Sequence, residues 1–132
     1  MKTYKAILLL IFTGLFQVSI SQPLMHTDTI SAIEASKKIG QYVIVKAKVV
    51  TTFFGEKLQG QPTYLNLDQN FPDNPMTVII YSDQLKKLNI NASDYEGKTI
   101  VVKGKMYLIP YENSKKKPCI KIYKKDQIKI VN

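Results

Sequence analysis

Two stretches of the chain carry nearly the same alternating pattern, and this repetition constrains the fold more than any other feature. Residues 40–50 read GQYVIVKAKVV, and residues 97–107 read GKTIVVKGKMY. In both, apolar residues alternate with lysines, which is the period of a β-strand with one buried and one solvated face. Ala47 and Gly104 hold equivalent places, so each strand has a small residue where the inner space is tight. We therefore expect the two strands to be neighbours in a small β-barrel.

The polar face of these two strands carries four lysines, which are Lys46, Lys48, Lys103 and Lys105. If the strands pair, the four ammonium groups lie together on the outside of the barrel. Like charges placed directly opposite each other are mildly destabilising, so an anionic partner is one interpretation of the pattern. The other interpretation is that the lysines are solvated and discourage edge-to-edge aggregation of the strands.

The remaining periodic segments complete an all-β plan with one or two short helices. A helix is predicted over residues 31–40, because Ser31 and Glu34 have capping-box spacing and Gly40 suits its end. A second short helix is predicted over residues 82–90. Further strands are predicted at residues 63–67, 76–81 and 119–125, and residues 127–131 continue or follow the last of them. A five-stranded barrel with a helix between its third and fourth strands is the plan of the OB-fold, a Greek-key barrel.

Six short motifs follow one another along the chain. They read A-x-x-x-I-G, V-x-V-x-A-x-V, Y-L-N-L, P-x-x-x-M-T-V-I-I, a Y-E-G-K segment with its alternating strand, and K-P-x-I-x-I. They stand at residues 35–40, 43–49, 64–67, 72–80, 95–106 and 117–122. Their order and spacing resemble a family of small secreted bacterial OB-fold proteins, many from Bacteroidetes-type genomes. The resemblance implies a nucleic-acid-binding-like OB domain and no established activity, because the family is described largely by its fold.

The chain departs from the pattern of that family in two places. Ala47 stands where the first strand of the family has a glycine, a change that should cost little. Residues 111–118, YENSKKKP, replace a short turn with a longer and more basic segment. This segment is interpreted as a loop, bounded by Pro110 and Pro118, that either adds binding contacts or only carries solvated charge.

The first 21 residues have the pattern of a signal peptide. Lys2 and Lys5 precede an apolar run over residues 6–16 that falls short of the ~20 residues a membrane-spanning helix needs. Small residues, Ser19 and Ser21, stand where a cut after residue 21 requires them, and an uncleaved anchor is the alternative. With no cysteine near the cut, a lipid anchor is not expected. The expected organisation is a signal peptide over residues 1–21, an OB-fold domain over residues 22–132, a periplasmic or secreted location, and no transmembrane segment after cleavage.

The charge of the chain is unevenly placed. Residues 22–97 contain 7 lysines and 8 acids, whereas residues 98–132 contain 10 lysines and 2 acids. Such asymmetry suggests one positive face or lobe. All 19 basic residues are lysines, and arginine is the side chain that reads guanine edges and clamps phosphates at two points. The chain is therefore suited to attracting anions and poorly equipped for base-specific readout, unless its lysine content only reflects an AT-rich genome.

Catalytic chemistry has little support in the sequence. His26 is the single histidine and lies in a polar lead, so a histidine-based triad would depend on it. Cys119 is the single cysteine, and one histidine with one cysteine cannot make a metal cluster. We expect no catalytic residue, no metal and no cofactor, and we expect Cys119 to be a small buried hydrophobe.

Polyanion binding has better support, because barrels of this type hold ligand on strands two and three and on the loops joining strands one to two and four to five. The latter loop carries Lys115, Lys116 and Lys117, which are candidate ligand contacts or simply a solvated loop tip. The rings that could stack on bases are those of Tyr64, Tyr81, Tyr111, Phe53 and Phe54, unless they are core or surface filler.

We therefore expect an exported, monomeric OB-fold binding module that is not an enzyme. Its expected partner is single-stranded nucleic acid or another polyanion, held through lysine-rich loops and exposed aromatic rings. The main alternative is a module of the cell envelope that binds a protein, a peptide or a small molecule and has no nucleic-acid role. Docking on anionic envelope surfaces is a third interpretation of the same lysines.

Overall fold

A computed structural model describes Gly14 and residues 28–132 of the chain. The expected signal peptide, residues 1–21, lies outside the described residues except for Gly14, and so does His26. Within the part of the chain that is described, no helix is long and apolar enough to cross a membrane.

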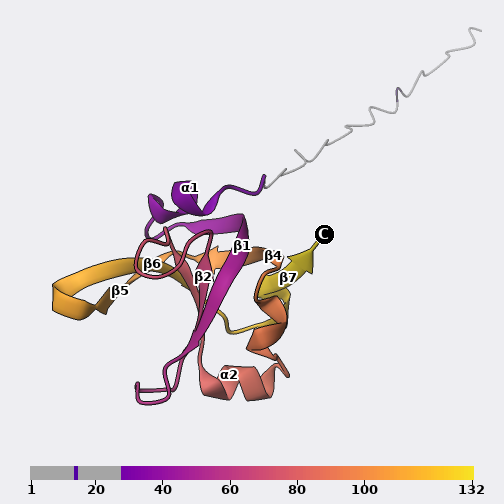
Figure 1. Ribbon diagram of the computed structural model, residues 1–132. Helices are drawn as coiled ribbons and strands as arrows, with labels where there is room; N and C mark the ends of the chain where they lie inside the picture. The colour runs from indigo at the N-terminus through magenta and orange to yellow at the C-terminus, as the bar shows by residue number, and fades with distance from the viewer. Residues whose placement is uncertain (1–13, 15–27) are drawn as a thin grey trace, which may run out of the picture.

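Seven strands form one curved sheet with short helices at its two ends (Figure 1). The longer elements are α1 (Ala32–Ser36), β1 (Tyr42–Phe54), β2 (Thr63–Leu67), β3 (Thr77–Ile80), α2 (Ser82–Lys87), β4 (Thr99–Lys105), β5 (Tyr107–Tyr111), β6 (Lys115–Lys121) and β7 (Ile128–Val131). Three 3₁₀ turns join them, which are η1 (Ala92–Tyr95), η2 (Glu112–Ser114) and η3 (Lys125–Gln127). The strand order is β5-β6-β3-β2-β1-β4-β7, and of its neighbouring pairs only β3 and β6 run parallel.

The predicted β-rich class with one or two short α-helices is confirmed, but the strand count differs from the five that were expected. The single strand predicted over the 97–107 repeat and beyond is divided at Met106 into β4 and β5, because the chain changes pairing partners there, from β1 and β7 to β6. Residues 128–131 form a strand of their own, β7, at the edge beside β4. The first helix is also shorter than predicted and ends at Ser36.

The two similar stretches of sequence do lie side by side, as their shared pattern predicted. β1 and β4 pair antiparallel, with Val45 opposite Val102 and Ala47 opposite Ile100. β1 is long enough to pair twice, with β4 over its first half and with β2 over its second half. The register shifts between Val49 and Thr51, which marks the point where β1 passes from one partner to the other.

One hydrophobic core lies on the concave side of the sheet. Its fully buried side chains alternate along the strands, as period-two patterning requires, and include Val45, Val49, Leu65, Leu67, Val78, Ile80, Ile100, Val102, Ile120 and Ile122. Helix α1 covers one end of the sheet with Ala32 and Ala35 in the core, and α2 lies at the opposite end (Figure 1). The Ser31 hydroxyl accepts a hydrogen bond from the Glu34 amide at 3.1 Å, which confirms the predicted helix cap.

Strands β4 and β6 approach each other along a seam that the side chain of Gln127 bridges. Its Nε2 donates to the carbonyl of Lys103 at 3.0 Å and to that of Lys121 at 3.1 Å. Its Oε1 accepts from the amides of Tyr123 at 2.7 Å and Lys124 at 2.9 Å. The side-chain amide of Gln127 therefore joins β4 and β6 by hydrogen bonds, as backbone hydrogen bonds join the neighbouring strands elsewhere in the sheet.

Gly104 allows this close approach. A Cβ atom at position 104 would lie 2.8 Å from Cγ2 of Ile120 and 3.1 Å from Nε2 of Gln127. Real Cβ atoms do not come so near to other heavy atoms, so a side chain there would have to push β6 or Gln127 away. The close approach of β4 and β6 therefore explains why the sequence has a glycine at position 104.

Residues 111–118, which were predicted to be a loop, are instead the end of a two-stranded arm. β5 and β6 pair antiparallel from Tyr107 opposite Cys119 to Tyr111 opposite Lys115, and η2 makes the turn. Asn113 and Ser114 adopt positive φ values of 55° and 66°, which the tight turn requires. The arm projects from the body of the sheet (Figure 1).

Candidate ligand-binding face

The face of β2, β3 and β6 that points away from the core carries a row of aromatic and basic side chains. Since Leu65, Val78 and Ile120 point into the core, their neighbours along each strand point outward. The register places Tyr64 opposite Ile79 and Ile79 opposite Lys121, and Cys119 opposite Tyr107. We call this surface the outer face and define it by Phe53, Tyr64, Tyr81, Tyr107, Lys121 and Tyr123.

Aromatic rings stack at one end of the outer face. The rings of Phe53 and Tyr64 lie 6.2 Å apart with an angle of 29° between their planes, and Phe53 remains 59% exposed. Burial raises the pKa of the Tyr64 hydroxyl, with smaller contributions from Tyr81 and Cys119 nearby. Phe53 and Tyr64 therefore form a stacked pair across β1 and β2, with Tyr81, the residue after β3, near Tyr64.

Two lysines converge on one ring at the other end of the outer face. The Nζ atom of Lys121 lies 5.0 Å from the centroid of the Tyr107 ring, and that of Lys105 lies 5.6 Å from it. The single ion pair among the described residues joins Lys103 to Asp126, so neither of these lysines has a carboxylate partner there. Two like charges held at one ring make a local site for an anion.

Lys117, grouped in the sequence with its two neighbours as a ligand contact, is placed differently. It is only 7% exposed, and its Nζ donates to the carbonyl of Pro72 at 2.8 Å and to that of Asn74 at 2.6 Å. The rings of Phe71 and Tyr111 each lie 5.7 Å from the same Nζ. Burial lowers the pKa of Lys117, with the carboxylate of Asp73 acting in the opposite direction. Lys117 ties the 68–76 turn to the β5–β6 arm and is not free to meet a polyanion.

Replacing Lys117 by methionine should therefore lower the free energy of unfolding by about 2 kcal/mol, because two buried carbonyls lose their donor. The matched control is Lys116→Met, one residue away and exposed, for which we expect a change within about 0.5 kcal/mol. Urea denaturation of both variants measures the difference. Equal stability of the two variants would show that the Lys117 contacts contribute nothing to the fold.

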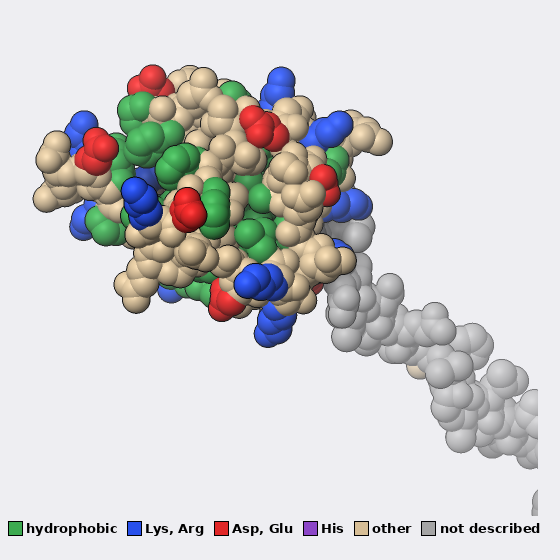
Figure 2. All heavy atoms as spheres, turned by 60° about the horizontal axis from the view of Figure 1, so that its bottom comes forward, with side chains coloured by type: hydrophobic (Ala, Val, Ile, Leu, Met, Phe, Trp, Pro, Cys, Tyr) green, Lys and Arg blue, Asp and Glu red, His purple; other side chains and the backbone are tan. Residues whose placement is uncertain are grey.

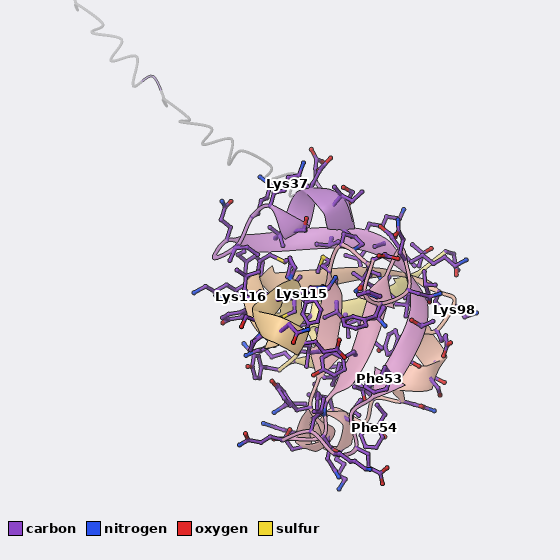
Figure 3. The ribbon with its side chains drawn as sticks, turned by 60° about the vertical axis from the view of Figure 1, so that its left-hand side comes forward. Lys37, Phe53, Phe54, Lys98, Lys115 and Lys116 are labelled. Atoms are coloured by element: carbon purple, nitrogen blue, oxygen red, sulfur yellow. The ribbon has the colours of Figure 1, made fainter. Side chains whose placement is uncertain are left out.

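Lys115 and Lys116 are exposed on the arm, while Phe53 and Phe54 lie at the end of β1 near α2 (Figure 3). The two predicted groups are therefore at different ends of the site, on β6 and β1, with β3 and β2 between them. Phe54 is 50% exposed, but it is the strand neighbour of Phe53 and so points to the opposite face of β1.

Tyr111 is a less suitable stacking residue than the sequence suggested. Its ring packs edge-on against Phe71, with the centroids 5.2 Å apart and the planes at 72°. It also contacts the ammonium group of Lys117. Tyr111 belongs to the packing that holds the arm against the 68–76 turn.

The four strand lysines of the repeat do not form one cluster. Lys46 lies opposite Val101 and Lys48 opposite Thr99, whereas Lys103 lies opposite Ile44 and Lys105 opposite Tyr42. They are spread along the β1–β4 pair, so no two of them face each other directly. Lys103 is occupied with Asp126 at 3.9 Å, and of the four only Lys105 reaches the ring of Tyr107.

Cys119 lies beneath the outer face and is fully buried, which confirms the sequence prediction for this residue. Burial raises the pKa of its thiol to about 11, so the thiol is protonated at neutral pH. Among residues 28–132, no group of three or more histidine, cysteine, aspartate or glutamate side chains comes together to hold a metal ion. The chemistry that the described residues offer is stacking, hydrogen bonding and cationic attraction.

A cleft of ≈ 730 Å³ opens at the α2 end of the outer face. It is lined by Gln59, Gly60, Gln61, Tyr81, Ser82, Asp83, Gln84 and Tyr123. On the side of the molecule shown in Figure 2, hydrophobic side chains gather between lysines and acids that are scattered singly. The positive charge of the chain is therefore not concentrated on that side.

Sequence reasoning missed Tyr107, Lys121 and Tyr123. A strand pattern predicts which side chains are buried, but it does not predict which exposed side chains from different strands come together. A usable signal was present, because Lys121 and Tyr123 alternate with the buried Ile120 and Ile122 in the same run.

Comparison with solved structures finds a similar fold in one part of a larger protein. Part of an aspartyl tRNA synthetase from Entamoeba histolytica is similar to it, with a TM-score of 0.54 and 16% sequence identity, over 85% of this chain and 23% of that one. A protein named as an aspartyl-tRNA synthetase from Leishmania major Friedlin gives a TM-score of 0.49 and 12% identity over 85% and 22% of the two chains, a score on which we base no argument. The chain thus spans about a quarter of the first structure, and at this identity the likeness shows the fold alone.

Comparisons with protein-family models and with curated proteins gave no match.

Proposed function

We propose that this chain is a binding module for single-stranded nucleic acid and that it uses the outer face of β2, β3 and β6. The observation that carries this proposal is that the outer face has stacked, partly exposed rings at one end and two lysines without a carboxylate partner at the other. Single strands are bound by stacking bases on aromatic rings while cationic groups follow the backbone phosphates. Phe53 and Tyr64 would supply the first kind of contact, and Lys121 and Lys105 the second.

The arrangement of the strands supports the same proposal. We infer that residues 99–111 act as one long strand, so that the curved sheet is a partly open OB-type barrel in which β4 and β6 approach each other at the seam that Gln127 bridges. In such barrels the ligand lies on strands two and three, which correspond here to β2 and β3. A solved structure with a similar fold is named as an aspartyl tRNA synthetase, a protein that acts with tRNA.

The absence of arginine from the sequence sets the expected kind of recognition. Lysine offers a compact charge without the rigid fork that reads a guanine edge at two points. We therefore propose binding that tolerates many sequences, with no catalytic role. We further propose that the module is exported by the signal peptide over residues 1–21, which would limit its nucleic acids to those outside the cytoplasm.

A protein or peptide partner is the second candidate function. Phe53, Phe54 and Leu58 are each about half exposed at one end of the sheet, and exposed apolar groups of this kind occur at interaction sites. A partner that stays bound at high salt would favour this candidate over the first.

The proposed function is tested by titrating salt during binding to single-stranded oligonucleotides. With about four phosphates engaged, the logarithm of affinity should fall with the logarithm of salt concentration at a slope of roughly −3. Fluorescence anisotropy with single-stranded DNA and RNA measures the slope, and heparin and anionic vesicles serve as competing polyanions. Removing the charge of Lys121 and Lys105 together should flatten the slope by about 1.4.

Lys37→Gln is the matched control for charge removal, because Lys37 lies beside α1, away from the arm (Figure 3). It should leave the slope unchanged. Tight binding with no salt dependence, or binding to vesicles without any to oligonucleotides, would overturn the proposal.

A further inference from the structure

We propose that the cleft between Tyr81 and Tyr123 is a subsite for one nucleobase of a single-stranded ligand. This inference rests on the proposed function and goes beyond it, because it assigns a place where an individual base enters the protein. The cleft volume of ≈ 730 Å³ lies in the range of small-molecule sites and is ample for one nucleotide.

The two rings of the cleft follow the ends of two neighbouring strands of the sheet, β3 and β6. β3 and β6 run parallel with Ile79 opposite Lys121, and the Ile122 amide donates to the Ile79 carbonyl at 3.0 Å. Two residues further along the chain, just beyond the ends of β3 and β6, Tyr81 and Tyr123 both line the cleft. Tyr123 is 51% exposed, so its ring is available to a ligand.

The Tyr81 wall is held in place by the loop between β1 and β2. A Cβ atom at Gly60 would lie 2.8 Å from Cδ1 of Tyr81, so the loop backbone packs directly on the ring. The Ser82 amide also donates to the Gly60 carbonyl at 3.2 Å. Next to it, Gln61 has a positive φ of 44°, a conformation that residues other than glycine rarely adopt. A wall fixed in this way loses little entropy when a ligand stacks on it.

The polar lining of the cleft suits the edge of a base. The amide side chains of Gln59, Gln61 and Gln84 offer both donors and acceptors, as the hydrogen-bonding edge of a base does. The Oε1 atom of Gln84 is buried and has no hydrogen-bond partner among the described residues. An N–H group of a bound base could satisfy this acceptor.

The charges around the cleft favour a base inside it and a phosphate outside it. The described residues that line the cleft include no lysine, and Asp83 is their only charged member, so a phosphate would be repelled from it. Lys121 lies two residues before Tyr123 on the same face, about 6.6 Å away along the strand. A nucleotide with its base in the cleft could therefore place its phosphate toward Lys121 and the ring of Tyr107.

The test uses uncharged nucleosides and homopolymeric oligonucleotides on the same full-length protein. Titrating adenosine, cytidine, guanosine and uridine into isotope-labelled protein should shift the amide signals of Gly60, Gln61 and Tyr123, with no dependence on salt. Tyr123→Ala should weaken oligonucleotide binding by about 5-fold to 150-fold, the range for one stacked base, and should leave the salt slope unchanged. Tyr123→Phe, which keeps the ring, should restore binding.

Gln84→Met, which keeps the size of the side chain, should narrow the difference in affinity among the four homopolymers without changing the salt slope. The inference is overturned if no nucleoside shifts these signals at millimolar concentration, or if oligosaccharides shift them more strongly. The proposed function survives that result when oligonucleotides still bind with the expected salt slope. If nucleosides bind in the cleft but oligonucleotides show no salt-dependent affinity, the proposed function fails while the inference about the cleft stands.

Discussion

Replacing Gly104 by valine should lower the free energy of unfolding by about 3 kcal/mol, the size expected when a side chain is forced into a packed seam. The first carbon of the new side chain would already meet Ile120 at 2.8 Å and the Gln127 amide at 3.1 Å. Relief requires β4 and β6 to separate, which also weakens the hydrogen bonds that bridge them. Urea denaturation followed by circular dichroism measures the loss.

Gly104→Ala should fall between the wild-type protein and the valine variant, since it adds the clashing atom alone. Lys105→Val is the matched control, because it places the same side chain on the next residue of β4, where the position is exposed. We expect it to change stability by less than about 0.5 kcal/mol. A valine variant at position 104 as stable as this control would show that the seam is looser than the described contacts imply.

Replacing Gln127 by glutamate should be nearly as costly at neutral pH, at about 2–3 kcal/mol, although the two side chains have the same shape. The Gln127 Nε2 group donates to two carbonyls, and a carboxylate oxygen in its place would face both of them with no hydrogen to share. The bonds that Oε1 accepts from the two amides would remain. The net effect is therefore repulsion at one end of an otherwise intact contact.

This loss should depend on pH in a predictable direction. Facing two carbonyls raises the folded-state pKa of the introduced carboxyl above the ordinary value of about 4.3. Between those two pKa values the folded state binds more protons than the unfolded state, so stability falls as pH rises through this window. Unfolding at pH 4 and at pH 7, compared with the wild-type protein, should show a smaller penalty at the lower pH. Gln127→Met removes the polar group entirely and should show a penalty that is the same at both values.

Much of the sheet could be predicted from local pattern because one face of each strand is buried. The alternation of Val43, Val45, Ala47 and Val49 with the residues between them predicted the buried face of β1, although β1 extends further, to Phe54. The similarity of the two repeated stretches also predicted that β1 and β4 pair, which the register confirms. These inferences succeed because period-two alternation follows directly from strand geometry.

The arm could not be predicted in the same way, because its structure depends on a distant segment. Lysines 115–117 follow a polar turn and so resemble a solvated loop. Lys117 is nevertheless buried, because the carbonyls of Pro72 and Asn74 come from more than forty residues away to accept its protons. No local pattern in the sequence encodes a carbonyl supplied by another loop.

The candidate site could be predicted only in part, because some of its residues also depend on contacts between distant segments. Phe53, Tyr64 and Tyr81 were recognised as candidate stacking residues, and the structure stacks Phe53 on Tyr64 with Tyr81 nearby. The convergence of Lys105 and Lys121 on Tyr107 depends on the change of pairing partner at Met106, which places the start of β5 against β6. Such a change of partner was not evident in an uninterrupted run of strand-forming residues.

The position of Gln127 also determines the order in which this chain can fold as it is made. β1, β2 and β3 can pair once they have been synthesised, but Ile120, Ile122 and the Gln127 bridge come from the last part of the sequence. Until that part is available, one side of the core and one edge of β3 remain uncovered. We therefore expect the growing chain to stay open and prone to association until late in synthesis. A chaperone would protect it best before that point.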